Sequence, residues 1–290
     1  MGAIRKIATL AIGAAGLLPS AFAQIDNIVV TSAASFQVGL PPPGSIGTIF
    51  CTGLTIPGLV TAAGVPLPYS LAGISVTIGG AQAPLFAVAE LAGYQQINFQ
   101  VPSGLAPVPG MDGDYAVVIQ QNGAQGSATA TGPVSNTPGD FFRLPGTSYG
   151  IFQHSADYSL VTENSPAQPG EILVTYLTGV GDGGLAYAVP DGQAAPLSPV
   201  DPVYQLNIGT VIYTYNIVAN GVPIGVVGDP NALLFIGLAP GMVGVFQINF
   251  ALPDSIPAGD LQITLRYTSY ASMFGSTNTY NSAAVLLPVR

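Results

Sequence analysis

The sequence is poor in charge. Of its 290 residues, only five are Lys or Arg and fourteen are Asp or Glu, and the formal net charge is −9. Charged residues make up 7% of the chain, against about 25% in an average soluble protein. Proteins that bind nucleic acid use cationic side chains to displace counterions from phosphates. The scarcity of Lys and Arg therefore excludes that class.

Cysteine, histidine and tryptophan are also scarce or absent. The chain has one cysteine, Cys51, one histidine, His154, and no Trp. A single cysteine cannot form an internal disulfide, and these two residues are too few for a zinc or copper site. Cys51 ends the apolar run 48–51. We expect it to be buried as a small hydrophobe, and a redox or intermolecular role is the alternative.

Glycine and proline are abundant, at 37 and 26 residues. They would interrupt helices every few residues, so long helices are disfavoured. Apolar residues make up 49% of the chain, enough to form a core. This composition predicts an all-β, turn-rich protein.

Residues 1–23 have the features of a secretory signal peptide. Arg5 and Lys6 precede an apolar stretch at 7–18, and Ala21 and Ala23 form an A-x-A cleavage site. The apolar stretch is shorter than the roughly 20 residues that span a bilayer. We therefore predict export and cleavage after Ala23. The mature chain would then have three arginines, no lysine and fourteen acidic residues.

The chain contains an internal repeat. Residues 43–53 resemble residues 169–179, and residues 96–102 (Q-I-N-F-Q-V-P) resemble residues 247–253 (Q-I-N-F-A-L-P). The order of the two motifs is the same in both copies, but the second copy has more residues between them. We expect the difference to be an inserted long loop or extra hairpin around residues 182–213.

Each copy of the repeat has the pattern of antiparallel strands. Residues 74–78 and 261–267 alternate apolar and polar side chains, and turn signals recur at about 8–12-residue spacing, as in β-sandwiches. We predict two tandem immunoglobulin-like antiparallel β-sandwiches, at 24–140 and 141–290. The uncharged stretch 230–253 imitates a membrane span, but Pro240 and Gly241 in its middle favour two strands joined by a turn.

The chain resembles an uncharacterised C-terminal domain family found in many secreted proteins of Solibacter-type acidobacteria. The resemblance implies tandem immunoglobulin-like modules of the IPT/TIG type, and it implies no catalytic residues. Cys51, where the family pattern usually has Gly, and residues 90–94 depart from it. The matching segments cover nearly all of the mature chain and are 30–36, 43–46, 66–68, 71–76, 83–86, 96–102, 138–142, 165–170 and 237–244.

Two motifs imitate enzyme signatures. Residues 146–150 spell G-x-S-x-G around Ser148, with His154 four residues beyond the motif, but no helix pattern follows and no acid lies between them. Residues 179–184 spell G-x-G-x-x-G, but prolines follow where a dinucleotide site requires a helix. We interpret both motifs as glycine-flanked turns.

Acidic and aromatic residues provide the candidate binding sites. Asp112 and Asp114 place two carboxylates one residue apart, which could bind calcium or simply form a hairpin turn; Asp182 and Asp191 flank the inserted loop. Glu90, Glu163 and Glu171 lie in no recognisable glycosidase motif. A tyrosine-lined, sugar-binding face is the other candidate, with half-buried packing as the alternative for the same residues. The richest groups are Tyr204, Tyr213, Tyr215, Tyr267, Tyr270 and Tyr280.

These patterns lead to one functional hypothesis and two alternatives. We predict an exported, non-enzymatic binding or structural protein of the cell surface or extracellular space, with a periplasmic location as the alternative, acting in adhesion or surface assembly. Its partners would be surface or extracellular proteins, or polysaccharide. A carbohydrate-binding module is the alternative, and a secreted hydrolase is the remote one. We expect no cofactor other than calcium, and no transmembrane segment after cleavage.

Overall fold

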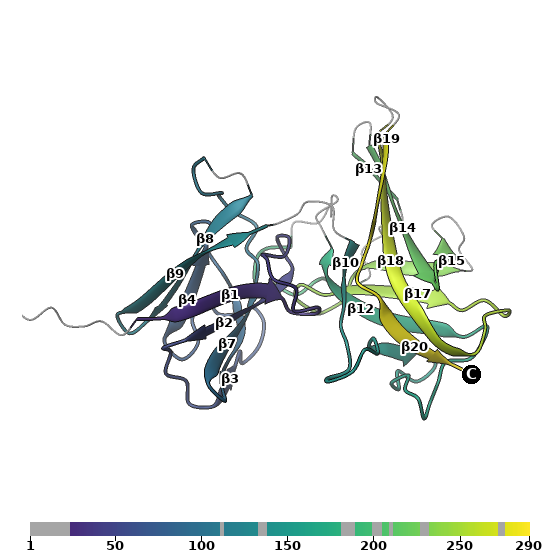
Figure 1. Ribbon diagram of the computed structural model, residues 1–290, viewed down its shortest axis with the longest axis horizontal. Helices are drawn as coiled ribbons and strands as arrows, with labels where there is room; N and C mark the ends of the chain where they lie inside the picture. The colour runs from purple at the N-terminus through teal and green to yellow at the C-terminus, as the bar shows by residue number, and fades with distance from the viewer. Residues whose placement is uncertain are drawn as a thin grey trace, which may run out of the picture.

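The computed structural model describes residues 24–110, 113–132, 138–180, 189–198, 205–208, 211–226, 232–271 and 276–290. Every regular element in these ranges is a β-strand, and Figure 1 shows two bodies of strands side by side. No helix within the described ranges is long and apolar enough to cross a membrane. The predicted signal peptide, residues 1–23, lies outside the described residues.

The first body is a sandwich of two antiparallel sheets. One sheet has the order β1-β2-β7-β6-β3, and the other has the order β5-β4-β8-β9. The strands are β1 (Asp26–Ser32), β2 (Ile46–Thr52), β3 (Leu59–Thr61), β4 (Ile74–Ile78), β5 (Ala81–Gln82), β6 (Leu85–Leu91), β7 (Tyr94–Gln100), β8 (Asp114–Gln121) and β9 (Ala124–Thr131).

Alternating side chains of both sheets form the core of this sandwich. Ile49 of β2 and Ile97 of β7 face Ile74 of β4 and Ile119 of β8, and all four are fully buried in one apolar cluster. Since side chains alternate along a strand, the residues between them point to the outer faces of the sheets. This parity determines which residues can contact a partner.

The second body repeats this plan. One sheet has the order β10-β12-β17-β16, with β11 also paired to β12. The other has the order β13-β14-β18-β19, with β15 on β14 and β20 on β18. The strands are β10 (Pro138–Phe141), β11 (Phe152–His154), β12 (Ile172–Val180), β13 (Gln205–Ile208), β14 (Val211–Ala219), β15 (Val222–Val226), β16 (Leu233–Leu238), β17 (Phe246–Ala251), β18 (Gly259–Ala271), β19 (Ser276–Asn281) and β20 (Val285–Val289).

The strand orders identify the fold. In sheet order, β1, β2, β7 and β6 take the places of strands A, B, E and D of an immunoglobulin domain, and β4, β8 and β9 take those of C, F and G. In the second body, β10, β12, β17 and β16 form the A-B-E-D sheet. The predicted all-β fold of two tandem immunoglobulin-like sandwiches is confirmed.

The two copies of the sequence repeat occupy equivalent places. Residues 46–51 of β2 pair with 95–100 of β7, and residues 172–177 of β12 pair with 246–251 of β17. In both copies the Ile and Phe of the Q-I-N-F motif are buried in the core, while the Gln and Asn are on the outer face. The repeat is therefore the central B–E strand pair of each sandwich.

Two local expectations are also met. The uncharged stretch 230–253 contains the antiparallel hairpin of β16 and β17 rather than a helix. The insertion contributes β13, which pairs with residues 211–214 of β14. These strands extend the β14–β18 ribbon beyond the sandwich, at the top of Figure 1. The expected boundary between residues 140 and 141 falls within β10, all of which belongs to the second sandwich.

A buried threonine links the two sandwiches. Thr178, at 0% exposure, accepts a hydrogen bond from the Ile46 amide of the first sandwich through Oγ1 (2.8 Å). The same hydroxyl donates to the Gly244 carbonyl (2.8 Å). Gly244 has a φ of 68°, and a Cβ there would lie 2.9 Å from the Gly44 carbonyl oxygen. Only glycine allows this close approach.

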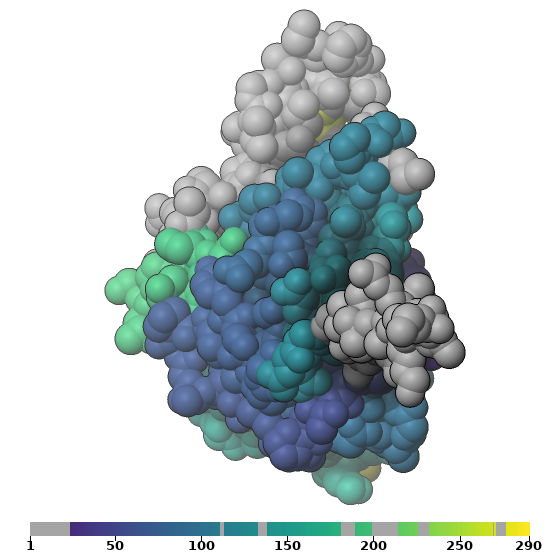
Figure 2. Space-filling model, turned by 90° about the vertical axis from the view of Figure 1, so that its left-hand side faces the viewer, coloured from purple at the N-terminus to yellow at the C-terminus, as the bar shows by residue number. Residues whose placement is uncertain are grey.

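A segment of the second half of the chain also binds the first sandwich. Within residues 189–198, the Gly192 amide donates to Gln100 Oε1 (2.6 Å), and the Gly192 carbonyl accepts from the Leu67 amide (2.8 Å). The Asp191 carboxylate accepts from the backbone amide and the hydroxyl of Ser103. In Figure 2 this segment, in green, lies against blue residues of the first sandwich. Asp191 thus serves the contact between the sandwiches.

The link at Thr178 can be tested with isosteric substitutions. Thr178→Val keeps the volume but leaves the Ile46 amide and the buried Gly244 carbonyl without this partner, so we expect a loss of about 1–3 kcal/mol in the free energy of unfolding. Thr175→Val is the matched control, because Thr175 is equally buried on the same strand but donates within its own sandwich, to the Ile151 carbonyl. Chemical denaturation gives the stability. Small-angle scattering should detect a changed arrangement of the sandwiches only for Thr178→Val, and equal profiles for both variants would contradict the link.

Candidate functional site

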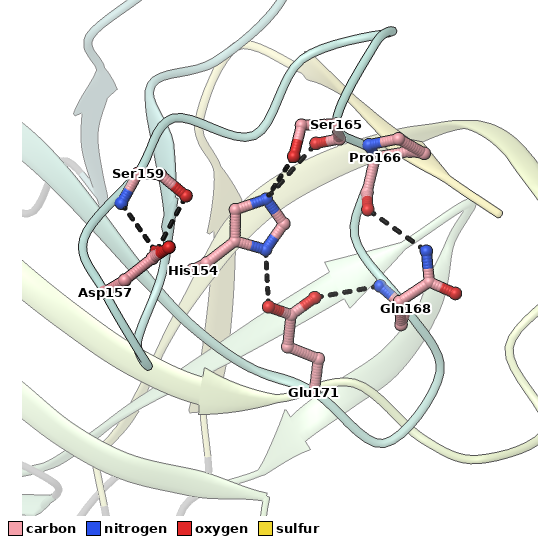
Figure 3. Close-up of polar contacts among 7 residues, drawn as sticks. All are labelled: His154, Asp157, Ser159, Ser165, Pro166, Gln168 and Glu171. Carbon is pink, nitrogen blue, oxygen red and sulfur yellow. Dashed lines mark hydrogen bonds and ion pairs between the residues drawn. The ribbon is translucent and has the colours of Figure 1, made fainter.

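The single histidine does not pair with the serine of the G-x-S-x-G motif. Ser148 is exposed, and its carbonyl accepts from the Leu286 amide. His154, at the end of β11, instead lies between Glu171 and Ser165 (Figure 3). The interpretation of residues 146–150 as a turn therefore agrees with their geometry. The sequence motif did not indicate the actual partners of His154.

His154 holds together a long surface loop. Its Nδ1 lies 2.5 Å from Glu171 Oε1, and its Nε2 lies 3.2 Å from the Ser165 carbonyl oxygen and 3.3 Å from Ser165 Oγ. The other Glu171 oxygen accepts from the Gln168 amide (2.9 Å). Both ends of the loop that joins β11 to β12 are thus tied to one imidazole (Figure 3).

The Ser165–His154–Glu171 group has the residue types of a catalytic triad but a different geometry. The base of a triad is directed at the serine hydroxyl, whereas His154 Nε2 lies at least as close to the Ser165 carbonyl oxygen (3.2 Å) as to Ser165 Oγ (3.3 Å). The Ser165 amide donates to Thr162, so it is directed away from any oxyanion. We interpret the group as a structural clasp of the loop.

The predicted calcium and tyrosine sites have separate outcomes. Asp112 and Asp182 lie outside the described residues, and Asp114 begins β8. Within the described ranges no group of three or more His, Cys, Asp or Glu residues could hold a metal ion. Calcium binding at Asp112 and Asp114 remains a prediction.

Three of the predicted tyrosines form one row across paired strands of the second sandwich. The Tyr215 and Tyr267 rings are in the core, with centroids 5.1 Å apart, and the exposed Tyr280 packs against Tyr267 at 6.2 Å. Tyr270 is exposed on the β18–β19 ribbon. Two of the six predicted tyrosines, Tyr215 and Tyr267, therefore serve packing in the core. Tyr204 lies outside the described residues.

An exposed cluster of three aromatic rings lies on the outer face of the β1-β2-β7-β6-β3 sheet. Phe50 of β2 packs against Phe36 (centroids 6.1 Å apart) and against Tyr94 (5.6 Å, edge to face). Phe36 is 55% exposed and Tyr94 is 42% exposed. We call these three residues the aromatic strip. Large aromatic side chains left exposed together are typical of binding surfaces.

Phe36 has an unfavourable backbone conformation. Its φ is 57°, in the left-handed region that a bulky residue rarely adopts. Such a conformation costs on the order of 1 kcal/mol for a residue with a Cβ. A glycine at this position would remove both the backbone cost and the exposed ring. The exposed Phe36 ring therefore packs against Phe50 at a cost in backbone energy.

A depression of about 440 Å³ lies beside the aromatic strip. Ala87 and Ala89 of β6 line it, opposite Asn98 and Gln96 of β7, and Leu59 of β3 also lines it. Gln96 Nε2 donates to Asn98 Oδ1 (2.8 Å), and Thr48 Oγ1 donates to the same oxygen (3.0 Å). Small side chains at Ala87 and Ala89 thus leave space next to a fixed pair of amides.

The sequence did not single out this face. The run 48–51 looked uniformly apolar, so the outward position of Phe50 between the buried Ile49 and Cys51 was not recognised. The repeat contained a usable signal, because the Gln and Asn of Q-I-N-F alternate with core residues in both copies. Combining that alternation with the pairing of the two motifs would have placed Phe50 beside Gln96.

No protein-family model and no curated protein matches the chain. Among solved structures, a Bacteroides ovatus mixed-linkage glucan utilization locus protein, SGBP-B, in complex with a mixed-linkage heptasaccharide, is 10% identical, with a TM-score of 0.27, over 94% of this chain and 61% of that chain. The C-terminal domain of the Streptococcus agalactiae AgI/II polypeptide BspA is 11% identical, with a TM-score of 0.18, over 90% and 99% of the two chains. The endo-fucoidan hydrolase MfFcnA4 is 14% identical, with a TM-score of 0.16, over 86% and 27%. The chain spans less than two thirds of the glucan-locus protein. TM-scores this low establish no shared function.

The clasp predicts a difference between two substitutions. His154→Ala removes hydrogen bonds to a carboxylate and a carbonyl in a site where the His154 and Glu171 side chains are only 13% and 20% exposed. We expect a loss of about 1–3 kcal/mol in unfolding free energy. Ser148→Ala removes an exposed hydroxyl and should change stability by less than about 0.5 kcal/mol. Urea denaturation measures both, and an unchanged midpoint for His154→Ala would contradict the clasp.

Cys51 is expected to be unreactive in the folded protein. It is 1% exposed, and burial, together with the nearby Glu90 charge, raises the pKa of its thiol to about 12. The thiolate is the reactive form, so a disulfide-exchange reagent at about pH 8 should leave the native protein unmodified. The same reagent should label the chain once it is unfolded in guanidinium, where the pKa returns to about 8.5. Equal labelling rates before and after unfolding would argue for an accessible, reactive thiol.

Proposed function

We propose that the mature chain is an exported, non-enzymatic binding protein that presents the outer face of its first sandwich to a macromolecular partner at or outside the cell surface. The observation that carries this proposal is the aromatic strip, in which the exposed Phe36 is held at a φ of 57°. Backbone strain and exposed aromatic area both lower stability without a partner. Contact with a partner would bury the aromatic area and offset the backbone cost.

The location follows from the sequence. Residues 1–23 have the features of a signal peptide, which supports export. Because the single cysteine forms no internal disulfide, the folded chain must be stabilised by its packing. Each sandwich has its own apolar core. A sandwich of this kind exposes a broad, flat sheet surface, which suits adhesion or surface assembly.

The absence of an enzymatic role is supported by the geometry around His154. His154 Nε2 is not directed at the Ser165 hydroxyl alone, and the Ser165 amide donates to Thr162 rather than toward an oxyanion. A secreted hydrolase, the remote alternative, would need a histidine base, and His154, the one histidine of the sequence, is held in the clasp.

Paired substitutions on the strip test the proposal. Phe36→Gly combined with Tyr94→Ser removes two exposed rings, each worth about 0.5–1.5 kcal/mol beyond its buried area. We expect at least a tenfold weaker binding of the labelled mature chain to envelope fragments of the exporting bacterium, since about 1.4 kcal/mol is tenfold. Binding isotherms from co-sedimentation give the dissociation constants.

The control is a tyrosine of matched exposure on the other sandwich. Tyr280 is 41% exposed, against 42% for Tyr94, and Tyr280→Ser should leave binding unchanged. Phe36→Gly should stay close to the parent in stability, because the relief of the positive φ offsets the loss of the Phe50 contact. Unchanged binding of the strip variant, at unchanged stability, would overturn the proposal.

A further inference from the structure

We infer that the ligand of this face is a neutral polysaccharide chain, lying across the strands from the aromatic strip into the depression. The inference rests on the proposed function and names the chemistry of the partner. Three independent features of the first sandwich support it: the shape of the face, its hydrogen-bonding groups and its charge.

The shape is a straight row across the whole sheet. Strand pairing aligns Val29 with Phe50, Phe50 with Gln96, Gln96 with Ala89, and Ala89 with Leu59. Four interstrand steps of about 4.8 Å make this row roughly 19 Å long. Apolar side chains stand at both ends, and the amide stands in the middle. Such a row fits an extended linear polymer better than a compact ligand.

In the second sandwich, a side chain occupies the position that corresponds to the depression. Its Q-I-N-F motif makes the same amide pair, with Gln247 Nε2 donating to Asn249 Oδ1 (2.9 Å). Opposite these amides lie Phe235 and Gly237, where the first sandwich has Ala87 and Ala89. A Cβ on Gly237 would lie 3.0 Å from the Phe235 ring, so this ring covers the glycine. The second sandwich closes the space with its own side chain, and the first leaves it open for a ligand.

The hydrogen-bonding groups suit hydroxyls. Asn98 Oδ1 accepts from both Gln96 and Thr48, which fixes the orientation of both amides. Among the described residues, Gln96 Oε1 and Asn98 Nδ2 have no partner, so an acceptor and a donor stand side by side at the depression. A sugar hydroxyl both donates and accepts, and the apolar face of a pyranose ring can stack on Phe50 or Tyr94. The face offers both kinds of contact within one row.

The charge excludes an anionic polymer. Residues 24–132 contain no Lys, Arg or His, and their acidic residues are Asp26, Glu90, Asp112 and Asp114. Uronic or sulfated glycans and anionic lipids would find no cation to pair with. The one carboxylate that lines the depression, Glu90, accepts from Gln95 Nε2 through both oxygens (3.0 Å each). An uncharged chain, unlike an anionic one, is not repelled by this carboxylate.

Affinity electrophoresis of the mature protein tests the inference. We expect at least one of four native gels to retard the protein; the gels contain xyloglucan, galactomannan, hydroxyethylcellulose or dextran. Gels containing polygalacturonate or hyaluronan should not retard it. Retardation should be the same in about 0.1 M and about 1 M salt, because no ion pairs are involved. No retardation in any neutral gel, or retardation only in anionic gels, would overturn the inference.

Two variants localise the site. Ala87→Phe combined with Ala89→Gly reproduces in the first sandwich the Phe235 and Gly237 of the second. This double variant should raise the dissociation constant, obtained from retardation against polysaccharide concentration, at least tenfold while the melting temperature stays near that of the parent. The reciprocal Phe235→Ala is the control, and it should not raise that constant. Gln96→Leu keeps the volume and removes the free acceptor, so it serves as a second variant should the double variant fold poorly, and it should raise the dissociation constant at least threefold. Retardation equal to that of the parent in the folded double variant, or in Gln96→Leu, would place the ligand elsewhere.

The envelope assay separates failure of the inference from failure of the proposed function. Periodate oxidation of the envelope glycans should abolish binding, and protease digestion should not. If protease abolishes binding while the strip variant remains defective, the face binds a protein, so the proposed function stands and the polysaccharide inference fails. If the strip variant binds as the parent does, both fail.

Discussion

The pairing of the second and fifth strands of each sandwich, β2 with β7 and β12 with β17, is the constraint on which the rest of the structure depends. Side chains alternate strictly along these strands, so the register that places Ile97 and Phe99 in the core also places Gln96 and Asn98 on the outer face. A slip of one residue would expose the core and bury the amides. Because the same pairing fixes the core and the outer face, the amide pair is as rigid as the fold itself.

The contact between the sandwiches depends on backbone groups more than on charge. Thr178 links Ile46 to Gly244, and the amide and carbonyl of Gly192 bond to Gln100 and Leu67. Such contacts suit a chain with few charged residues, since they need no salt bridges and are little affected by ionic strength. The second half of the chain thus contacts the first sandwich at Gln100, the last residue of β7, the strand that carries the amide pair. The strand that carries the amide pair is thus anchored at its end.

The sequence predicted the fold well because the fold follows from alternation, turns and repetition. The hairpin at 233–251, the equivalence of the two repeats and the extra hairpin in the insertion all follow from such local patterns. The aromatic strip was not predicted, because Phe50 lies in an apolar run and only the register with Gln96 shows which way it points. The His154–Glu171–Ser165 clasp was missed for a related reason, since its members meet through the path of a loop. Tyr215 and Tyr267 were candidates for a binding face, and the structure places both in the core, where the sheet order rather than the composition decides their burial.

Phe235 bears on how the number of open faces in such a two-sandwich chain changes during evolution. An open face and a closed face differ at outward positions of one strand, Ala87 and Ala89 in β6 against Phe235 and Gly237 in β16. These positions do not belong to either core, so exchanging them leaves the packing of the sandwich intact. A duplicated domain can therefore open or close this space by changes at two exterior positions. Under the proposed function, the chain would be monovalent, with the first sandwich binding the ligand and the second contributing to the rigidity of the pair.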